Sequence, residues 1–212
     1  MTDGLWHSAK LSIQRCATSY SDPSDKQANE QILITEHDDC LCVSIAGSND
    51  VYDWLQNCNL DQVELGDHYI SEGVLRAAKN VMAMVVHYKS GMDSSSGKPI
   101  QFEGHSKGGA VALACSMMAN LRDWDVHQVI TFACPRITRE RIVYPYKVTQ
   151  FVATGDPIPS LPPWRPWRKW RHNGRIIKVG KQTVANVTRE WFGNIARPIK
   201  MHMIKNYISI FN

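Results

Sequence analysis

The chain has 212 residues, of which 43% are hydrophobic and 21% charged, and its formal net charge at pH 7 is +4. This length and composition are typical of one soluble globular domain, residues 1–212, with a sizeable core. The sequence has no apolar run long enough to span a bilayer and no N-terminal secretory signal, so we expect a protein that lies in the cytoplasm or is peripheral to a membrane.

Apolar residues recur with helical or strand periodicity along most of the chain. Helices are expected over residues 5–20, 72–88 and 106–121, and after a loop that begins at residue 198. Strands are expected over residues 31–36, 40–46, 100–103, 127–133, 147–153 and 175–179, with a short helical turn or loop at 53–57. The first two strands predict an antiparallel hairpin. Strand and helix then alternate, which predicts an α/β fold with a mostly parallel central sheet and flanking helices.

A Gly-x-Ser-x-Gly pentapeptide occupies residues 104–108, where a predicted strand meets a predicted helix. In this context Ser106 is expected on a sharp strand-to-helix turn, a nucleophile elbow, that lifts its hydroxyl above the sheet. Gly104 and Gly108 allow the close backbone approach that such a turn needs. The N–H groups at the start of the following helix favour a developing negative charge at the same place. Ser106 is therefore the candidate nucleophile.

A serine nucleophile needs a general base, and the base needs an acid that orients it. In hydrolases with this elbow the chain order is Ser, then Asp or Glu, then His. Asp156 follows the apolar strand at 147–153 and is expected just beyond its carboxyl end, where active groups gather in open α/β sheets. Asp123 and Asp125 follow the helix after Ser106 and are interpreted as solvated loop residues.

Only two histidines, His172 and His202, follow Asp156 in the sequence. His172 lies at the start of a predicted strand and is interpreted as a surface or packed residue. His202 lies in a loop before the last helix, from which it can reach over the strand ends. The sequence thus predicts a catalytic triad of Ser106, His202 as the base, and Asp156 as the orienting acid.

Seven segments of the chain carry a resemblance to a known family. They are residues 43–48 (Val-Ser-Ile-Ala-Gly-Ser), 53–55 (Asp-Trp-Leu), 73–77 (Gly-Val-Leu-Arg-Ala), 104–109 (Gly-His-Ser-Lys-Gly-Gly), 131–136 (Thr-Phe-Ala-Cys-Pro-Arg), 155–163 (Gly-Asp-Pro-Ile-Pro-Ser-Leu-Pro-Pro) and 170–174 (Trp-Arg-His-Asn-Gly). In order and content they resemble the motifs of the class 3 lipase family, α/β-hydrolases that include fungal triacylglycerol lipases. The resemblance implies the α/β-hydrolase fold and the same triad.

The resemblance also implies an oxyanion hole formed by Ser48 and the backbone N–H of Lys107. Two such donors, held in place before the reaction, contribute roughly 3 kcal/mol each to transition-state stabilisation. Two positions depart from the family pattern. Ala46 stands where the family has an arginine. That arginine is usually structural, so its replacement is expected to change local packing more than the chemistry. Lys107 stands where the family has an apolar residue, and its side chain is expected to reach solvent. The alternative is that it steers acidic substrates.

Residues 164–171 contain three tryptophans and four cationic side chains. They begin a strongly basic part of the chain, because residues 164–212 carry 11 Lys and Arg against one acidic residue, whereas residues 1–163 carry 13 against 19. Tryptophan favours the membrane interface, and basic groups attract anionic lipid headgroups. A rim that contacts membrane or substrate is therefore predicted from Trp164, Arg165, Trp167, Arg168, Lys169 and Trp170. The alternative is that one or two of these tryptophans are core residues or cover the sheet edge, with arginines stacked on them.

The six cysteines form no Cys-x-x-Cys pair and no cluster with histidine at metal-ligand spacing, so we expect reduced thiols, no metal and no cofactor. Nucleic acid is not an expected partner, because no binding module accompanies the basic segment. The predicted function is that of a serine carboxylic-ester hydrolase, a lipase or carboxylesterase that cleaves acylglycerols or similar lipid esters. The alternatives are a phospholipase A1-type enzyme on anionic phospholipids and a non-enzymatic lipid- or membrane-binding module. The sequence indicates no oligomeric state.

Overall fold

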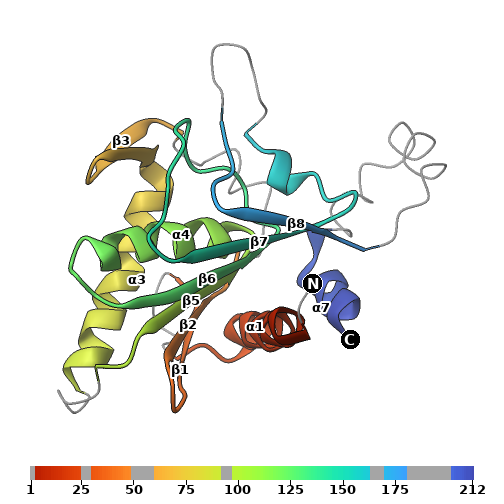
Figure 1. Ribbon diagram of the computed structural model, residues 1–212, viewed down its shortest axis with the longest axis horizontal. Helices are drawn as coiled ribbons and strands as arrows, with labels where there is room; N and C mark the ends of the chain where they lie inside the picture. The colour runs from red at the N-terminus through yellow and green to blue at the C-terminus, as the bar shows by residue number, and fades with distance from the viewer. Residues whose placement is uncertain (1–2, 25–29, 49–59, 92–96, 163–169, 181–201) are drawn as a thin grey trace.

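The structure is a computed structural model that describes residues 3–24, 30–48, 60–91, 97–162, 170–180 and 202–212. Within these residues a six-stranded sheet has the strand order β1-β2-β5-β6-β7-β8 (Figure 1). The strands are β1 (Ile32–Glu36), β2 (Leu41–Ile45), β5 (Ile100–His105), β6 (Val126–Phe132), β7 (Lys147–Ala153) and β8 (Arg175–Val179). The β1–β2 pair is antiparallel and the other pairs are parallel, so the predicted α/β sheet with its N-terminal hairpin is confirmed.

Helices cover both faces of the sheet (Figure 1). On one face lie α3 (Glu72–Ser90) and α4 (Lys107–Asn120), and on the other lie α1 (Asp3–Ser21) and α7 (Ile204–Phe211). Helix α4 packs against both the sheet and α3, so every residue from Gly108 to Ala119 is buried. Its small residues let the helix axis approach the strands closely, and a helix that is apolar on all sides is stable only in such a buried position.

A second hairpin, formed by β3 (Gln62–Leu65) and β4 (His68–Ser71), precedes α3 and was not predicted from the sequence. Its two strands are joined by Gly66 and Asp67, and Gly66 has a φ of +59°. A Gly-Asp pair between two short runs of alternating residues is a recognised hairpin signal, so the sequence did contain the information. Both strands of the hairpin pack against α3.

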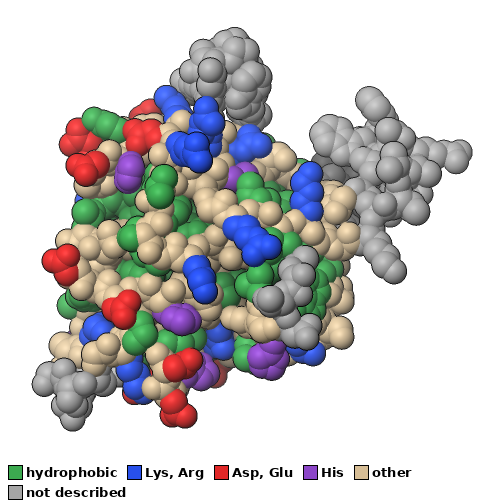
Figure 2. Space-filling model, viewed as in Figure 1, with side chains coloured by type: hydrophobic (Ala, Val, Ile, Leu, Met, Phe, Trp, Pro, Cys, Tyr) green, Lys and Arg blue, Asp and Glu red, His purple; other side chains and the backbone are tan. Residues whose placement is uncertain are grey.

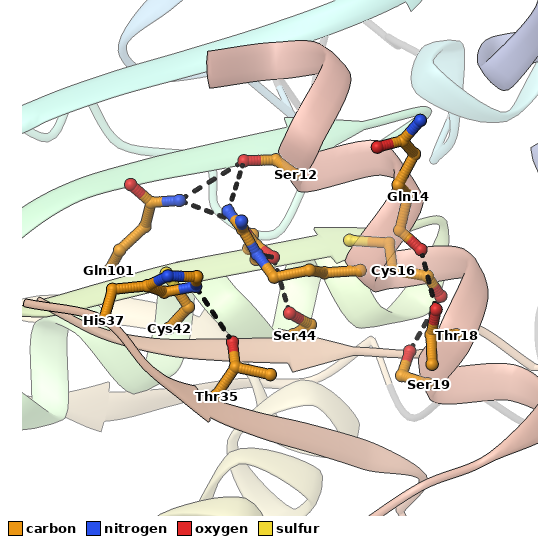
Figure 3. A network of polar contacts seen from close by, with 12 residues as sticks. Ser12, Gln14, Cys16, Thr18, Ser19, Thr35, His37, Cys42, Ser44 and Gln101 are labelled. Carbon is orange, nitrogen blue, oxygen red and sulfur yellow. Dashed lines mark hydrogen bonds and ion pairs between the residues drawn. The ribbon is translucent and has the colours of Figure 1, made fainter. Parts of the chain in front are cut away.

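A buried polar network joins α1 to the middle of the sheet (Figure 3). The guanidinium of Arg15 donates to both carboxylate oxygens of Glu103 on β5, with distances of 2.7 and 2.8 Å. Ser44 on β2 donates to the same carboxylate, as does the Gln101 amide, whose nitrogen lies also within bonding distance of Ser12. Glu103 is fully buried. Since an unpaired carboxylate would be very costly there, these donors are what allow a charge inside the fold.

Charged side chains are unevenly distributed on the face shown in Figure 2. Acidic side chains gather at its left and lower margins, and most Lys and Arg side chains lie across its middle and upper part. The cysteines within the described residues, namely Cys16, Cys40, Cys42, Cys115 and Cys134, are free and buried. In the described ranges no helix is both long and apolar enough to cross a membrane.

Candidate active site

The segments predicted to carry the chemistry meet at one edge of the sheet. Because β2, β5 and β7 run parallel, their carboxyl ends lie along the same edge. Ser48 follows β2, Ser106 follows β5 and Asp156 follows β7, whereas His202 lies just before α7. This edge is where ligands bind in open α/β sheets.

The turn at Ser106 has the strained geometry expected of a nucleophile elbow. Ser106 has φ 58° and ψ −127°, a backbone conformation that is rare for a residue with a side chain. A Cβ at Gly104 would overlap the backbone of Gly108, and one at Gly108 would overlap the carbonyl oxygen of Ile45. Both glycines are therefore required by close backbone approach, as the sequence predicted.

Asp156, His202 and Ser106 form a continuous chain of hydrogen bonds. Nδ1 of His202 lies 3.1 and 3.0 Å from the two carboxylate oxygens of Asp156, and its Nε2 lies 2.7 Å from the Ser106 hydroxyl oxygen. The carboxylate can only accept, so Nδ1 carries the ring proton and Nε2 is free to accept from the serine. All three residues are buried, with exposed fractions of 6%, 3% and 0%. In such a desolvated site each polar interaction is stronger than it would be in water.

The Asp156 carboxylate has two further donors that the sequence did not predict. The hydroxyl of Tyr207 on α7 donates to one oxygen at 2.7 Å, and the backbone N–H of Ile158 donates to the other at 2.9 Å. The same tyrosine hydroxyl accepts from the N–H of Ala153 at 2.9 Å. Burial and the adjacent carboxylate raise the pKa of Tyr207 well above its usual value, so the group stays a neutral donor. These contacts fix the rotamer of Asp156.

A second network holds the segments on either side of Ser106. Tyr20 on α1 accepts from the Gly47 N–H at 2.8 Å and lies 2.9 Å from Nδ1 of His105, while Nε2 of His105 lies 2.9 Å from the carbonyl oxygen of His202. A carbonyl only accepts, so Nε2 of His105 carries the proton and Nδ1 accepts from the Tyr20 hydroxyl. Tyr20 from the N-terminal helix thus connects the Gly47 loop to His105 at the elbow, and His105 connects the elbow to the histidine loop.

Because His105 is buried, we expect the free energy of unfolding to fall in acid. Burial, and secondarily His202, lower its pKa from 6.5 to about 3. Between these two values the unfolded chain binds a proton that the folded chain does not, so the free energy of unfolding falls as the pH falls. One such group contributes a slope of about 1.4 kcal/mol per pH unit. His172, whose pKa is also lowered by burial, adds to the slope of the wild type.

Urea unfolding at several pH values between about 4 and 7 measures this slope. We expect His105→Gln to unfold with a clearly shallower pH dependence than the wild type, because the amide does not titrate. If the free energy of unfolding depended on pH in the same way in both proteins, His105 would take up its proton equally well in the folded and the unfolded state.

The two segments predicted to form an oxyanion hole lie against each other. A Cβ at Gly47 would come within 2.8 Å of both the His105 carbonyl oxygen and the Ser106 Cβ, so the residue before Ser48 passes directly beside the nucleophile. Lys107 is the first residue of α4. Its N–H is one of those that a helix leaves without an intrahelical acceptor. The segments that carry Ser48 and this N–H therefore both adjoin Ser106, and their role as an oxyanion hole stays a prediction.

The side chain of Lys107 does not reach free solvent, contrary to expectation. Its ammonium donates to both carboxylate oxygens of Glu30 at 2.9 and 2.7 Å, and the side chains are only 19% and 10% exposed. The sequence could not show this pair because its members are 77 residues apart. A charge paired in this way is also a poor binding group for an acidic substrate.

The remaining sequence candidates lie elsewhere. The ring nitrogens of His172 contact Gln150 and the Pro159 carbonyl oxygen, in keeping with the interpretation of a packed residue. Asp123 and Asp125 follow the far end of α4, away from the edge that carries Ser106.

The rim prediction is wrong for Trp170. Its side chain is 3% exposed, and the Arg139 guanidinium lies 5.0 Å from the ring centroid, as in the alternative in which a tryptophan is core or covers the sheet edge with an arginine stacked on it. An almost fully buried ring has no surface with which to enter a membrane. The other predicted rim residues, Trp164, Arg165, Trp167, Arg168 and Lys169, lie outside the described residues, as does the predicted turn at 53–57.

The arrangement of the sheet and its flanking helices is found in solved structures of fungal lipases. The Rhizomucor miehei lipase–propeptide complex matches with a TM-score of 0.70 at 16% sequence identity, over 85% of this chain and 70% of that chain. A lipase from Rhizopus microsporus var. chinensis matches with a TM-score of 0.69 at 15% identity, over 86% and 77%. Lip2 lipase from Yarrowia lipolytica matches with a TM-score of 0.66 at 13% identity, over 85% and 81%. The fold is therefore that of the α/β-hydrolases.

The sequence itself defines the family more narrowly. Residues 42–165, more than half of the chain, match the class 3 lipase family. The chain belongs to the class 3 lipase family. No curated protein sequence matches it significantly.

Proposed function

We propose that this protein is a serine carboxylic-ester hydrolase that cleaves acylglycerols or similar lipid esters through an acyl-enzyme. The observation that carries the proposal is the unbroken hydrogen-bond chain from Asp156 through His202 to Ser106. A serine hydroxyl is a weak nucleophile, and this arrangement supplies both the base that activates it and the acid that orients the base. Membership of a lipase family supports a lipid ester as the substrate.

The geometry supports a reaction in two halves. Ser106 attacks the ester carbonyl while Nε2 of His202 accepts the hydroxyl proton, and Asp156 stabilises the resulting imidazolium. Ser48 and the N–H of Lys107 donate to the oxyanion of the tetrahedral intermediate. His202 then protonates the departing alcohol. In the second half His202 activates a water molecule, which releases the fatty acid and restores Ser106.

The basic, tryptophan-rich composition of residues 164–171 supports a second element of the proposal, contact with an anionic lipid surface. A phospholipase A1-type specificity would use the same triad on such a surface. Of this segment only Trp170 and Arg171 are described, so the contact is proposed from the sequence of its remaining residues.

The test compares wild type and Ser106→Ala on short- and long-chain p-nitrophenyl esters, a triacylglycerol emulsion and anionic phospholipid vesicles. We expect hydrolysis by the wild type and a loss of about 10⁴-fold or more in the variant. Faster turnover of the vesicles than of the emulsion would favour the phospholipase alternative. Binding of vesicles without Ser106-dependent hydrolysis of any ester would overturn the proposal in favour of a lipid-binding module.

A further inference from the structure

The ion pair between Lys107 and Glu30 is a feature of this chain that the triad does not use. Lys107 follows the nucleophile directly, at a position where the family pattern has an apolar residue. Both of its contacts to the Glu30 carboxylate are of charge-assisted length, 2.9 and 2.7 Å, and both side chains are largely buried. Hydrogen bonds of this type are stronger than neutral ones. The pair therefore ties two backbone segments together.

The first of these segments is the chain that precedes β1. Glu30 is followed by Gln31, whose carbonyl oxygen accepts from the Ala46 N–H at 2.9 Å. This bond extends the β1–β2 ladder, in which Ile32 is paired with Ile45. Glu30 therefore lies beside the end of β2, where the chain turns into the loop that carries Ser48.

The second segment is the start of α4. The Gly108 backbone lies so close to the carbonyl oxygens of Ile45 and Ala46 that no Cβ fits between them. The start of α4 and the end of β2 are thus in direct backbone contact. The Lys107–Glu30 ion pair joins the same two regions through their side chains. Each of the two proposed oxyanion donors, Ser48 and the N–H of Lys107, belongs to one of the joined segments.

We propose that Glu30 and the Lys107 side chain are a positioning pair that sets the spacing of the two oxyanion donors. The inference rests on the proposed function. Donors in an oxyanion hole are effective because they need no rearrangement as charge develops, so a small loosening of the junction weakens the transition state more than the bound substrate. The Glu30 carboxylate also balances the positive charge of Lys107, so no unpaired ammonium lies beside Ser106 to select acidic esters.

The experiment is a double-mutant cycle on ester hydrolysis with Glu30→Gln, Lys107→Met and the double variant, with rates expressed per titrated active site. We expect each single change to lower kcat and kcat/KM together by about tenfold with little change in KM, because the loss is confined to the transition state. The double variant should fall no further than the single ones, since all three remove the same interaction. Lys98→Met, which breaks the exposed Lys98–Glu36 pair, should leave kcat unchanged.

The reversed pair, Glu30→Lys with Lys107→Glu, provides rescue and covers the case in which a single variant folds poorly. It should recover part of the lost kcat, whereas a merely structural role would alter urea stability and leave kcat per active site unchanged. A kcat for Glu30→Gln within twofold of the wild type, or additive losses in the double variant, would overturn the inference. These results presuppose Ser106-dependent hydrolysis by the wild type, so they are distinct from a failure of the proposed function.

Discussion

Replacement of Asp156 by asparagine is expected to lower kcat for ester hydrolysis by about 10⁴-fold while the protein stays folded. The Asp156 carboxylate accepts from Nδ1 of His202 and so leaves Nε2 free for the Ser106 hydroxyl. An amide can donate to Nδ1 instead, which favours the tautomer that protonates Nε2 and removes the base. Steady-state kinetics on a soluble p-nitrophenyl ester measure the loss, and circular dichroism checks the fold.

Tyr207→Phe is the matched control for this prediction. It removes one donor to the same carboxylate and leaves the Ala153 N–H without its acceptor, but it keeps the charge and the contact to His202. We expect a loss of about tenfold in kcat and of roughly 1–3 kcal/mol in stability, the usual cost of a buried donor that is left unsatisfied. If Asp156→Asn lost no more activity than Tyr207→Phe, the carboxylate would not orient the base.

Replacement of Glu103 by glutamine is expected to cause the largest loss of stability of any single change proposed for this chain. The Glu103 carboxylate is fully buried and receives two hydrogen bonds from Arg15. Removal of its charge leaves the Arg15 cation without a counter-ion in a mostly buried position. Breaking such a pair from one side costs about 3–5 kcal/mol, which corresponds to a fall of roughly 10 °C in Tm for a chain of this size.

Thermal and urea unfolding measure this effect, with Lys98→Ala as the comparison. Lys98 pairs with Glu36 at 2.8 Å, but both side chains are substantially exposed. Solvent screens such a pair, so its loss is expected to cost far less than the loss of the buried pair. Replacing both partners, Arg15→Met with Glu103→Leu, should cost less than Glu103→Gln alone, because no buried charge is left unpaired. Equal losses for the buried and exposed pairs would contradict the interpretation.

The sequence predicted the sheet and the principal helices well, because their patterns are local. The strand at 100–105 ends at a glycine-flanked serine, and this context alone was sufficient to place Ser106 on the turn that the structure shows. Chain order and the positions of the strand ends were then sufficient to choose Asp156 and His202. In the structure Asp156 is hydrogen-bonded to His202, and His202 is hydrogen-bonded to Ser106. Their catalytic roles stay a prediction until activity is measured.

The contacts that hold the site in place were not predictable in the same way. Arg15 with Glu103, Tyr20 with His105, and Lys107 with Glu30 join residues 88, 85 and 77 positions apart, and no periodicity links such partners. Composition was misleading at Trp170, because a tryptophan next to cations suits both a membrane rim and a ring covered by an arginine. The hairpin at 62–71 is different, since its Gly-Asp turn is a local signal that the sequence carries.

Covalent labelling tests most directly whether Ser106 is the nucleophile of an acyl-transfer reaction. The protein is treated with a p-nitrophenyl alkylphosphonate, which forms a stable adduct with an activated serine, and is then digested and analysed by mass spectrometry. We expect one adduct per chain on the peptide that contains Ser106, release of p-nitrophenol in equal amount, and no adduct in Ser106→Ala. An unlabelled Ser106, or equal labelling of the wild type and the variant, would contradict the role of Ser106 as the nucleophile.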